Sequence, residues 1–125
     1  MNFPSDSKIW GPGVWFVIHV LGLKAKTMDK IKEYIEFVKS IIEKLPCDVC
    51  RGHALRYLQS NPLEDSIQLK NNDGEYIGMF KWSWTFHNAV NMRLGKQIIN
   101  YDTALGIYEN EEVCTVSCSS EPVTN

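Results

Sequence analysis

The sequence lacks a basic excess, and it lacks an apolar run long enough to cross a membrane. Among its 125 residues, 13 lysines and arginines face 15 aspartates and glutamates, for a net charge of −2. That balance does not neutralise a phosphate backbone, so we expect no nucleic-acid partner. The longest apolar run, Gly13–Leu23, contains His19 and is shorter than the roughly 20 residues of a membrane span. No cleavage site follows it, so we expect no targeting segment and a cytoplasmic protein.

Cysteine is scarce and unevenly placed. The chain has only four cysteines, in two local pairs, Cys47 with Cys50 and Cys114 with Cys118. A small secreted scaffold spreads its cysteines so that they tie distant segments together, and this chain does not. The pattern therefore indicates redox pairs or a metal site rather than a disulfide framework.

The motifs of several common enzyme classes are also missing. No P-loop, HExxH or GxSxG sequence occurs, and Gly11-Pro12-Gly13 lacks the third glycine and the preceding strand of a dinucleotide fingerprint. The Gly-Pro-Gly stretch instead opens a predicted helix that carries Trp15 and His19 one turn apart, with Trp10 just before it. Taken alone, Trp15 is typical of a core residue and His19 of a core histidine whose hydrogen bonds are satisfied.

Hydrophobic periodicity predicts an all-α protein. The clearest case runs from Met28 to Leu45, where apolar residues recur every three or four positions until Pro46 ends the segment. Pro12 is predicted to be the first residue of an earlier helix that ends near Lys24. We predict a small antiparallel bundle of four main helices with a short fifth one, over residues 12–24, 28–45, 47–59, 80–94 and 102–109.

The remaining segments carry turn and tail chemistry. Residues 63–78 contain Asn72-Asp73-Gly74 and are predicted to form a long loop or a small hairpin. Gly95 is predicted to cap the fourth helix at its C-terminus. Residues 109–125 are polar, acidic and poor in large apolar side chains, which is typical of a flexible tail.

The Pro46-Cys47-Asp-Val-Cys50 segment has the chemistry of a reactive dithiol. Proline before it and a helix after it place Cys47 at a helix N-terminus, where the dipole and free N–H groups favour the thiolate. One helical turn brings the two sulfurs within bonding reach. Half of a structural zinc site explains the same spacing equally well. The setting between two helices argues against a thioredoxin fold.

The fourth predicted helix carries a polar stripe. Trp84, His87, Asn88 and Asn91 follow the i, i+3, i+4, i+7 pattern of one helix face. Such a stripe either faces solvent or binds a flat polar ligand, with aromatic rings stacking and amides reaching its heteroatoms. The opposite face is predicted to carry Phe86, Ala89, Val90 and Arg93.

Three motifs occur in order along the chain: W-G-x-x-x-W-x-x-x-H, then P-C-x-x-C, then H-N-x-V-N-x-x-L-G-K. Each is modest alone, but their order and spacing, over about residues 8 to 108, resemble the Erv/ALR family of FAD-dependent sulfhydryl oxidases. The matching residues are Trp10, Gly11, Trp15, His19, Pro46, Cys47, Cys50, His87, Asn88, Val90, Asn91, Leu94, Gly95 and Lys96.

The resemblance implies a four-helix bundle with a short fifth helix that holds FAD non-covalently at one end. It implies that Cys50 lies against the isoalloxazine and that Cys47, nearer to solvent, exchanges disulfides with incoming thiols. His53, on the helical face of Cys50, is either a further flavin contact or a surface histidine. The other implied cofactor contacts are Trp10, Gly11, Trp15, His19, His87, Asn88, Val90, Asn91, Leu94 and Lys96.

The resemblance also implies a reaction and a domain division. Electrons would pass from thiol-containing proteins, or from a redox relay protein, through Cys47 and Cys50 to FAD and then to dioxygen, which yields hydrogen peroxide. The oxidase domain would cover residues 1–108, followed by the tail. The tail pair Cys114 and Cys118 would form a shuttle disulfide, unless the two are incidental surface cysteines. A homodimer without a metal ion is expected.

One departure from the family pattern stands out. Family members usually have a structural disulfide between the positions that Trp84 and Tyr101 occupy here. We therefore expect aromatic packing to hold the fifth helix in place of that disulfide. In this respect the chain resembles the compact enzymes of large cytoplasmic DNA viruses, for which host cytoplasm or virion is the expected location.

Two alternatives from other functional classes stay open at the level of sequence. The first is a non-enzymatic zinc module that uses Cys47 and Cys50 together with Cys114, Cys118 or His53. It leaves the tryptophan, histidine and asparagine motifs unexplained. The second is a flavin-free thiol chaperone or disulfide carrier.

Overall fold

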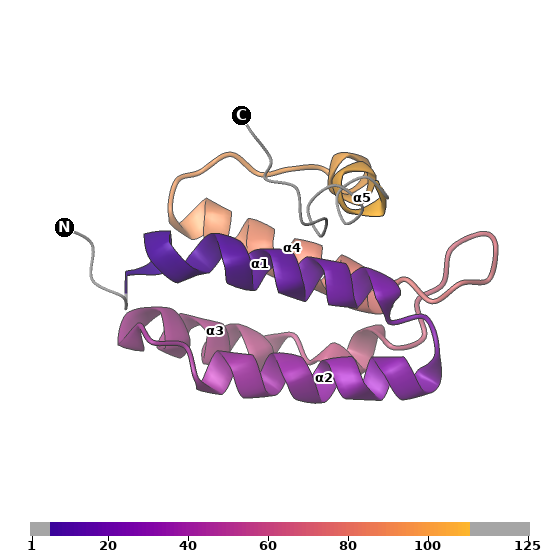
Figure 1. Ribbon diagram of the computed structural model, residues 1–125, viewed down its shortest axis with the longest axis horizontal. Helices are drawn as coiled ribbons and strands as arrows, with labels where there is room; N and C mark the ends of the chain where they lie inside the picture. Colours follow the sequence, from indigo (N-terminus) through magenta and orange to yellow (C-terminus); the bar gives the residue numbers. More distant parts are fainter. Residues whose placement is uncertain (1–5, 111–125) are drawn as a thin grey trace, which may run out of the picture.

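The computed structural model describes residues 6–110, and over that range the chain is all-helical (Figure 1). Its only β-type pairing there is an isolated bridge between Lys70 and Tyr76. The elements are α1 (Ser7–Lys24), α2 (Met28–Glu43), α3 (Asp48–Ser60), the 3₁₀ helix η1 (Leu63–Ser66), α4 (Gly78–Arg93) and α5 (Tyr101–Glu109).

The four long helices form a bundle, and α5 packs on its outside. α1 contacts α4 and α2, and α2 contacts α3, while α5 lies against both α1 and α4. In Figure 1 the four long helices run roughly along the same axis, whereas α5 is seen almost end-on. The predicted fold, a four-helix bundle with a short fifth helix, is therefore confirmed. None of the helices within residues 6–110 is both long and apolar enough to span a bilayer.

The core is built on the apolar stripe of α2. Ile31, Val38 and Ile42 are almost completely buried there, and they pack with buried side chains from the other three long helices. Thr27 begins α2 as its N-cap, because its hydroxyl accepts the Lys30 N–H. The predicted helix is confirmed, although α2 ends at Glu43, a little before the predicted end.

The first helix begins earlier than predicted. Asp6 is its N-cap and accepts the Lys8 N–H at 2.9 Å, so α1 starts at Ser7, and Pro12 lies inside the helix rather than at its first position. Proline there leaves the Lys8 carbonyl without its helical partner. Lys8 is exposed, so water satisfies that carbonyl at low cost. The capping chemistry of Asp6 outweighs the proline signal.

The connections follow the predicted turn chemistry. After η1, the backbone turns at residues 71–74, where the Asn71 side chain accepts the N–H groups of Asp73 and Glu75. Gly74 has a φ of 80°, and Gly95, which follows α4, has a φ of 71°. Both values favour glycine. Residues 63–78, predicted as a long loop or a small hairpin, contain η1 and a tight turn closed by the isolated Lys70–Tyr76 bridge. The predicted glycine cap of α4 is confirmed.

The segment that leads into α5 is held by side chains of α4. The Trp84 indole donates to the Ile99 carbonyl at 2.7 Å, and the Asn88 amide both donates to that carbonyl and accepts the Ile99 N–H. The Trp84 and Tyr101 rings meet edge to face with centroids 5.4 Å apart. Aromatic packing thus occupies the place of the missing disulfide, as predicted. The tail cysteines, Cys114 and Cys118, lie outside the described residues.

Candidate functional site

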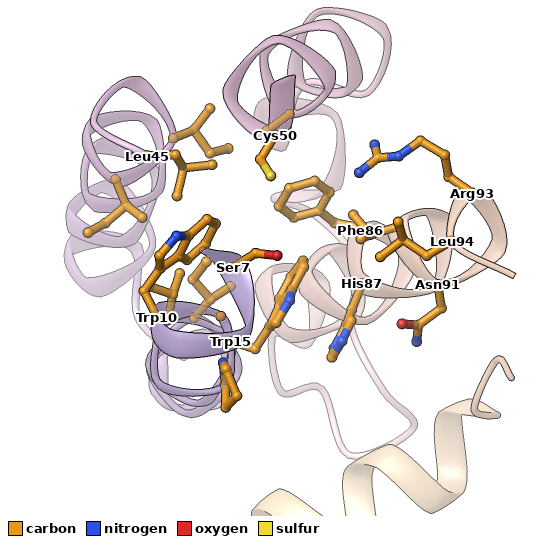
Figure 2. Close-up of a pocket in the computed structure, with 18 of the residues that line it drawn as sticks. Ser7, Trp10, Trp15, Leu45, Cys50, Phe86, His87, Asn91, Arg93 and Leu94 are labelled. Atoms are coloured by element: carbon orange, nitrogen blue, oxygen red, sulfur yellow. The ribbon is translucent and has the colours of Figure 1, made fainter. Parts of the chain in front are cut away.

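A cavity of about 620 Å³ opens at the end of the bundle where α1 and α3 begin and α2 and α4 end (Figure 2). Its volume lies within the range of small-molecule sites, about 300–1,000 Å³. Most of the wall is apolar or aromatic. Its lining includes Trp10, Gly11, Val14, Trp15, Ile18, Leu45, Cys50, Ala54, Phe86, His87, Val90, Asn91, Arg93, Leu94, Lys96 and Tyr108.

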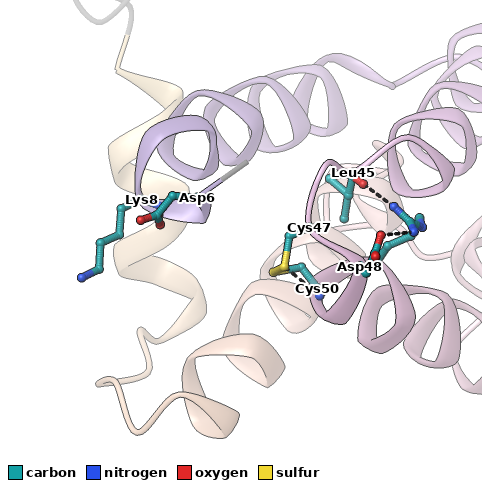
Figure 3. Close-up of a disulfide and its surroundings, with 7 residues drawn as sticks. Asp6, Lys8, Leu45, Cys47, Asp48 and Cys50 are labelled. Carbon is teal, nitrogen blue, oxygen red and sulfur yellow. Dashed lines mark hydrogen bonds and ion pairs between the residues drawn. A yellow bond between two sulfur atoms is a disulfide. The ribbon is translucent and has the colours of Figure 1, made fainter. Parts of the chain in front are cut away.

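A disulfide between Cys47 and Cys50 forms part of this site (Figure 3). Cys47 is the N-cap of α3, and the Cys50 N–H donates to the Cys47 sulfur at 3.1 Å. Cys50 lines the cavity, and its sulfur points inward in Figure 2, whereas Cys47 is not part of the lining. The same bond therefore has one sulfur in the cavity wall and the other outside it.

The turn that carries the disulfide is held by Arg51. Its guanidinium donates to the Leu45 carbonyl at 2.7 Å and forms an ion pair with Asp48 (Figure 3). These contacts tie the end of the α2–α3 connection to the first turn of α3. Val49, between the cysteines, is 69% exposed, so an incoming thiol can reach this turn. The N-terminal end of α3 also stabilises a thiolate at Cys47.

One wall of the cavity is a stack of flat rings. Trp15 lies almost parallel to His87, with ring centroids 3.9 Å apart and planes inclined by 4°. The ring of Phe86 packs against Trp15, with the two ring centroids 5.0 Å apart. All three line the cavity. Such a wall suits a flat ligand that stacks on aromatic faces.

Behind this wall lies a buried hydrogen-bonded chain. His19 is only 3% exposed; its Nδ1 lies 2.9 Å from Ser83 Oγ, and its Nε2 lies 2.8 Å from His87 Nδ1. Burial, and next the neighbouring His87, lower the pKa of His19 to about 3. Burial, and next the positive charge of Lys96, lower the pKa of His87 to about 4. Both rings are therefore neutral at pH 7.

The neutral state of His19 makes stability depend on pH. Its pKa is lower in the folded protein than the usual 6.5, so the unfolded chain binds more protons in acid. The stability that neutral His19 adds to the folded protein is fully present above pH 6.5 and is lost as the pH falls toward 3. We expect His19 alone to remove about 2 kcal/mol of the free energy of unfolding between about pH 6.5 and pH 4.5.

Urea unfolding across this range measures the effect of the histidine. His19→Gln should flatten the dependence by about 1.4 kcal/mol per pH unit in the acid range. His53→Gln is the matched control: desolvation, and next Arg93 and Arg56, lower the pKa of His53 as well, but this histidine lies near the surface, so its loss should change the slope less than the loss of His19. Equal slopes in the wild type and His19→Gln would contradict the assignment.

The cavity also gathers positive charge. Lys8, Arg93 and Lys96 line it, and no aspartate or glutamate among residues 6–110 belongs to the lining. Cations on an otherwise apolar surface attract an anionic ligand, and the low polarity of the wall strengthens that attraction. The site as a whole therefore suits a flat, aromatic and negatively charged molecule in contact with Cys50.

The structure brings most of the predicted site residues to this cavity, but not all of them. Three of the predicted cofactor contacts lie elsewhere: His19 is buried behind His87, Asn88 binds the Ile99 backbone, and His53 contacts Arg56 near the surface. Cys47, predicted to be catalytic, also lies outside the lining. Those in the lining are Trp10, Gly11, Trp15, Cys50, His87, Val90, Asn91, Leu94 and Lys96.

The predicted polar stripe of α4 is divided between two tasks. His87 and Asn91 line the cavity, whereas Trp84 and Asn88 hold the segment before α5. Phe86, Val90 and Arg93, predicted on the opposite face of the helix, also line the cavity, so that part of the prediction is wrong. Polarity alone defined the predicted face. The apolar residues of α4 next to the polar stripe are what indicates a cavity that binds flat rings.

Several other lining residues carry no signal in the sequence. Lys8 belongs to the first turn of α1, which the proline-based start of that helix excluded, and Tyr108 belongs to α5. No local pattern marks them as part of a site. Among residues 6–110, no group of three or more histidine, cysteine, aspartate or glutamate side chains is arranged to hold a metal ion.

Comparison with known proteins agrees with this geometry. The sequence profile of the Erv1 / Alr family matches residues 12–110. A protein named FAD-linked sulfhydryl oxidase from African swine fever virus (isolate Pig/Kenya/KEN-50/1950) is 37% identical over 111 residues, which cover 86% of each chain. The putative FAD-linked sulfhydryl oxidase 347L of Invertebrate iridescent virus 6 is 31% identical over 75% of this chain and 86% of its own.

A solved structure shares the fold. The crystal structure of the yeast Erv1 core superimposes with a TM-score of 0.70 and 18% sequence identity, and the match covers 89% of both chains. The profile spans most of the sequence, and its span contains the disulfide turn and most of the residues that line the cavity. The resemblance inferred from the motifs is thus confirmed, and the chain belongs to the Erv1 / Alr family.

Proposed function

We propose that this protein is an FAD-dependent sulfhydryl oxidase that forms disulfides in thiol-containing proteins and produces hydrogen peroxide. One observation carries the proposal: the Cys47–Cys50 disulfide has one sulfur in the wall of a cavity that suits a flat, anionic cofactor. The relatives named FAD-linked sulfhydryl oxidase cover most of the chain and support the same activity. They favour it over the zinc module.

The residues of the cavity fit FAD in shape and in charge. The two ring systems of FAD are flat and aromatic, as are the side chains of Trp15 and Phe86. The FAD diphosphate is anionic, and Arg93 and Lys96 offer cations in a lining to which residues 6–110 add no carboxylate. We infer that Trp15, His87, Asn91, Arg93 and Lys96 hold the cofactor. When bound, FAD accepts an electron pair from the reduced cysteines and transfers it to dioxygen.

The protein's own part in the reaction is disulfide exchange. A substrate thiolate attacks the Cys47 sulfur, the Cys47–Cys50 bond breaks, and Cys50 leaves as a thiolate. A second substrate thiol, once deprotonated, then attacks the mixed disulfide, so the substrate gains a disulfide and Cys47 leaves as a thiolate. The pair of electrons now resides on the two reduced cysteines. The helix N-terminus stabilises the Cys47 thiolate, and the turn keeps Cys50 at the cavity wall.

Visible absorbance and oxygen uptake test the function directly. The purified protein should be yellow, should consume oxygen when dithiothreitol is added, and should produce about one peroxide per oxygen consumed. A metal chelator should change none of these. Protein that binds no flavin when FAD is in excess, and forms no peroxide from thiols, would overturn the proposal.

The second cysteine pair is proposed to relay electrons from protein substrates. Cys114 and Cys118 lie outside the described residues, within an acidic stretch of the sequence. The sequence spacing of one helical turn would let them form a disulfide. We expect Cys114→Ser to leave oxidation of dithiothreitol within about twofold while slowing oxidation of a reduced protein substrate about tenfold or more. Equal loss on both substrates would remove the relay.

We further propose a homodimer in the cytoplasm, or in the virion if the chain is viral. The outer side of α1 exposes Ile9, Phe16, Val17 and Leu21, at 40–55% of their surface. Large apolar side chains gathered on one helix favour association with a second copy. The support for the location is the viral origin of the similar oxidases. Sedimentation equilibrium would test whether the protein is a dimer. Fractionation of the cells that produce it would test its location.

A further inference from the structure

The buried chain of Ser83, His19 and His87 fixes where each proton lies. Ser83 is completely buried on α4, and its Oγ lies 2.6 Å from the Phe80 carbonyl oxygen. A carbonyl only accepts, so the Ser83 hydroxyl donates its single proton there. Its oxygen is then free to act only as an acceptor toward His19. This serine belongs to none of the motifs that indicated the cofactor site.

The direction of the first bond sets that of the second. Because Ser83 Oγ accepts, His19 Nδ1, at 2.9 Å from it, carries a proton and donates. His19 is neutral, so its Nε2 has a lone pair. The 2.8 Å contact between His19 Nε2 and His87 Nδ1 needs one proton, and it must therefore come from His87 Nδ1. A neutral His87 then has an unprotonated Nε2.

Tyr34, the other polar neighbour of Ser83, does not reverse the direction of these hydrogen bonds. Its hydroxyl donates to the Ile18 carbonyl at 2.7 Å, so it has no proton left for Ser83. Burial raises the pKa of Tyr34, and a hydrogen bond with Ser83 offsets part of that rise. Even if the Ser83 proton moved between Phe80 and Tyr34, its oxygen would still accept from His19.

We propose that Ser83 is a positioning residue that locks the tautomers of His19 and His87, so that His87 presents a hydrogen-bond acceptor, Nε2, to the bound cofactor. The inference rests on the proposed FAD site, and the partner it requires is a hydroxyl or N–H group of FAD. His87 lines the cavity, and Trp15 is stacked almost parallel on its ring, so the imidazole is held against a half-turn that would put a ring carbon in place of each nitrogen. With the opposite tautomer, Nε2 would donate and would oppose a ligand donor.

Nitrogen NMR of histidine-labelled protein reads the tautomers without any reference to activity. In the purified holoprotein at about pH 7, His19 and His87 should both show a protonated Nδ1 and an unprotonated Nε2. His53, near the surface, is the internal reference of the opposite kind: its Nδ1 accepts from the Arg56 guanidinium, so it should show mainly a protonated Nε2. A protonated Nε2 on His19 or His87 would overturn the proposal. The pattern stays readable if the protein holds no flavin, so failure of the proposed function is distinguishable.

Variants of α4 test the role of the hydroxyl. Ser83→Ala should let the two buried rings populate both tautomers and should weaken FAD binding about tenfold, as expected for loss of a hydrogen bond. Ser83→Thr keeps the hydroxyl and should restore the wild-type spectrum. Thr85→Ala is the matched control, because Thr85 also donates to a carbonyl of α4 but does not touch the histidines.

The outcomes separate a positioning role from a merely structural one. Lower thermal stability of Ser83→Ala with an unchanged histidine spectrum and unchanged FAD affinity would refute the proposal. A change of the spectrum in Thr85→Ala equal to that in Ser83→Ala would refute it as well. If Ser83→Ala does not fold, the spectrum of the wild type alone still decides which nitrogens carry the protons.

Discussion

Cys50→Ser is expected to lower oxidase turnover about a thousandfold or more while FAD stays bound. The Cys50 sulfur is the member of the disulfide that lies in the cavity wall, so no other cysteine among residues 6–110 can reach the cofactor there. Serine keeps the size and much of the polarity of the side chain, so the cavity should retain its shape. Oxygen uptake with dithiothreitol measures turnover, and the visible spectrum measures bound flavin.

Cys47→Ser is the matched partner variant, and alkylation tells the two apart. Both variants lose the disulfide and therefore both lose turnover. In Cys47→Ser, bound FAD should shield the remaining Cys50 from iodoacetamide, because that sulfur faces the cavity. In Cys50→Ser, the remaining Cys47 should react equally fast with and without FAD. Equal shielding of the two cysteines would contradict the assigned roles, as would more than a tenth of wild-type turnover in Cys50→Ser.

Local chemistry explains why much of the fold was predictable. The stripe from Ile31 to Ile42 has one consistent period, and the Thr27 cap and Pro46 bound it on either side, so α2 formed where expected. Gly74 and Gly95 adopt the positive φ values that their turns require. The position of Cys47 as an N-cap also follows from neighbours in the sequence. Signals within about four residues sufficed in each case.

The errors arose where two local signals competed or where the tertiary fold decided. Asp6 and Pro12 each suggest a helix start, and only the cap geometry shows that Asp6 prevails. On α4, helical periodicity places Trp84, Asn88 and His87 on one face. In the folded chain, Trp84 and Asn88 instead form hydrogen bonds with the backbone of Ile99. Helical periodicity tells which residues share a face, and the packing partner of that face comes from elsewhere in the chain.

The buried proton chain could not be predicted from the sequence at all. Ser83 and His19 are separated by 64 positions, and His19 and His87 by 68. The motifs marked both histidines as important, but they gave no reason to connect them with a serine. Only the packing of α1 on α4 brings these groups within hydrogen-bond distance. Roles that depend on such contacts follow from the tertiary structure and not from local sequence.

Trp15→Ala is expected to weaken FAD binding on the order of 100-fold, which corresponds to about 2.7 kcal/mol. The indole forms the stacked wall of the cavity with His87 and also packs on Phe86. Its removal takes away a flat apolar surface and frees the His87 ring to turn. Titration of the apoprotein with FAD, followed by flavin fluorescence, measures the dissociation constant.

Two further variants isolate the contribution of the flat ring. Trp15→Phe retains an aromatic surface and should recover most of the affinity, to within about tenfold of the wild type. Phe16→Ala removes the adjacent aromatic side chain of α1, which is 42% exposed and does not line the cavity, and should change the affinity less than about threefold. Similar losses in Trp15→Ala and Phe16→Ala would mean that α1 stability, rather than the indole face, controls binding. Unchanged affinity in Trp15→Ala would place the cofactor rings away from this wall.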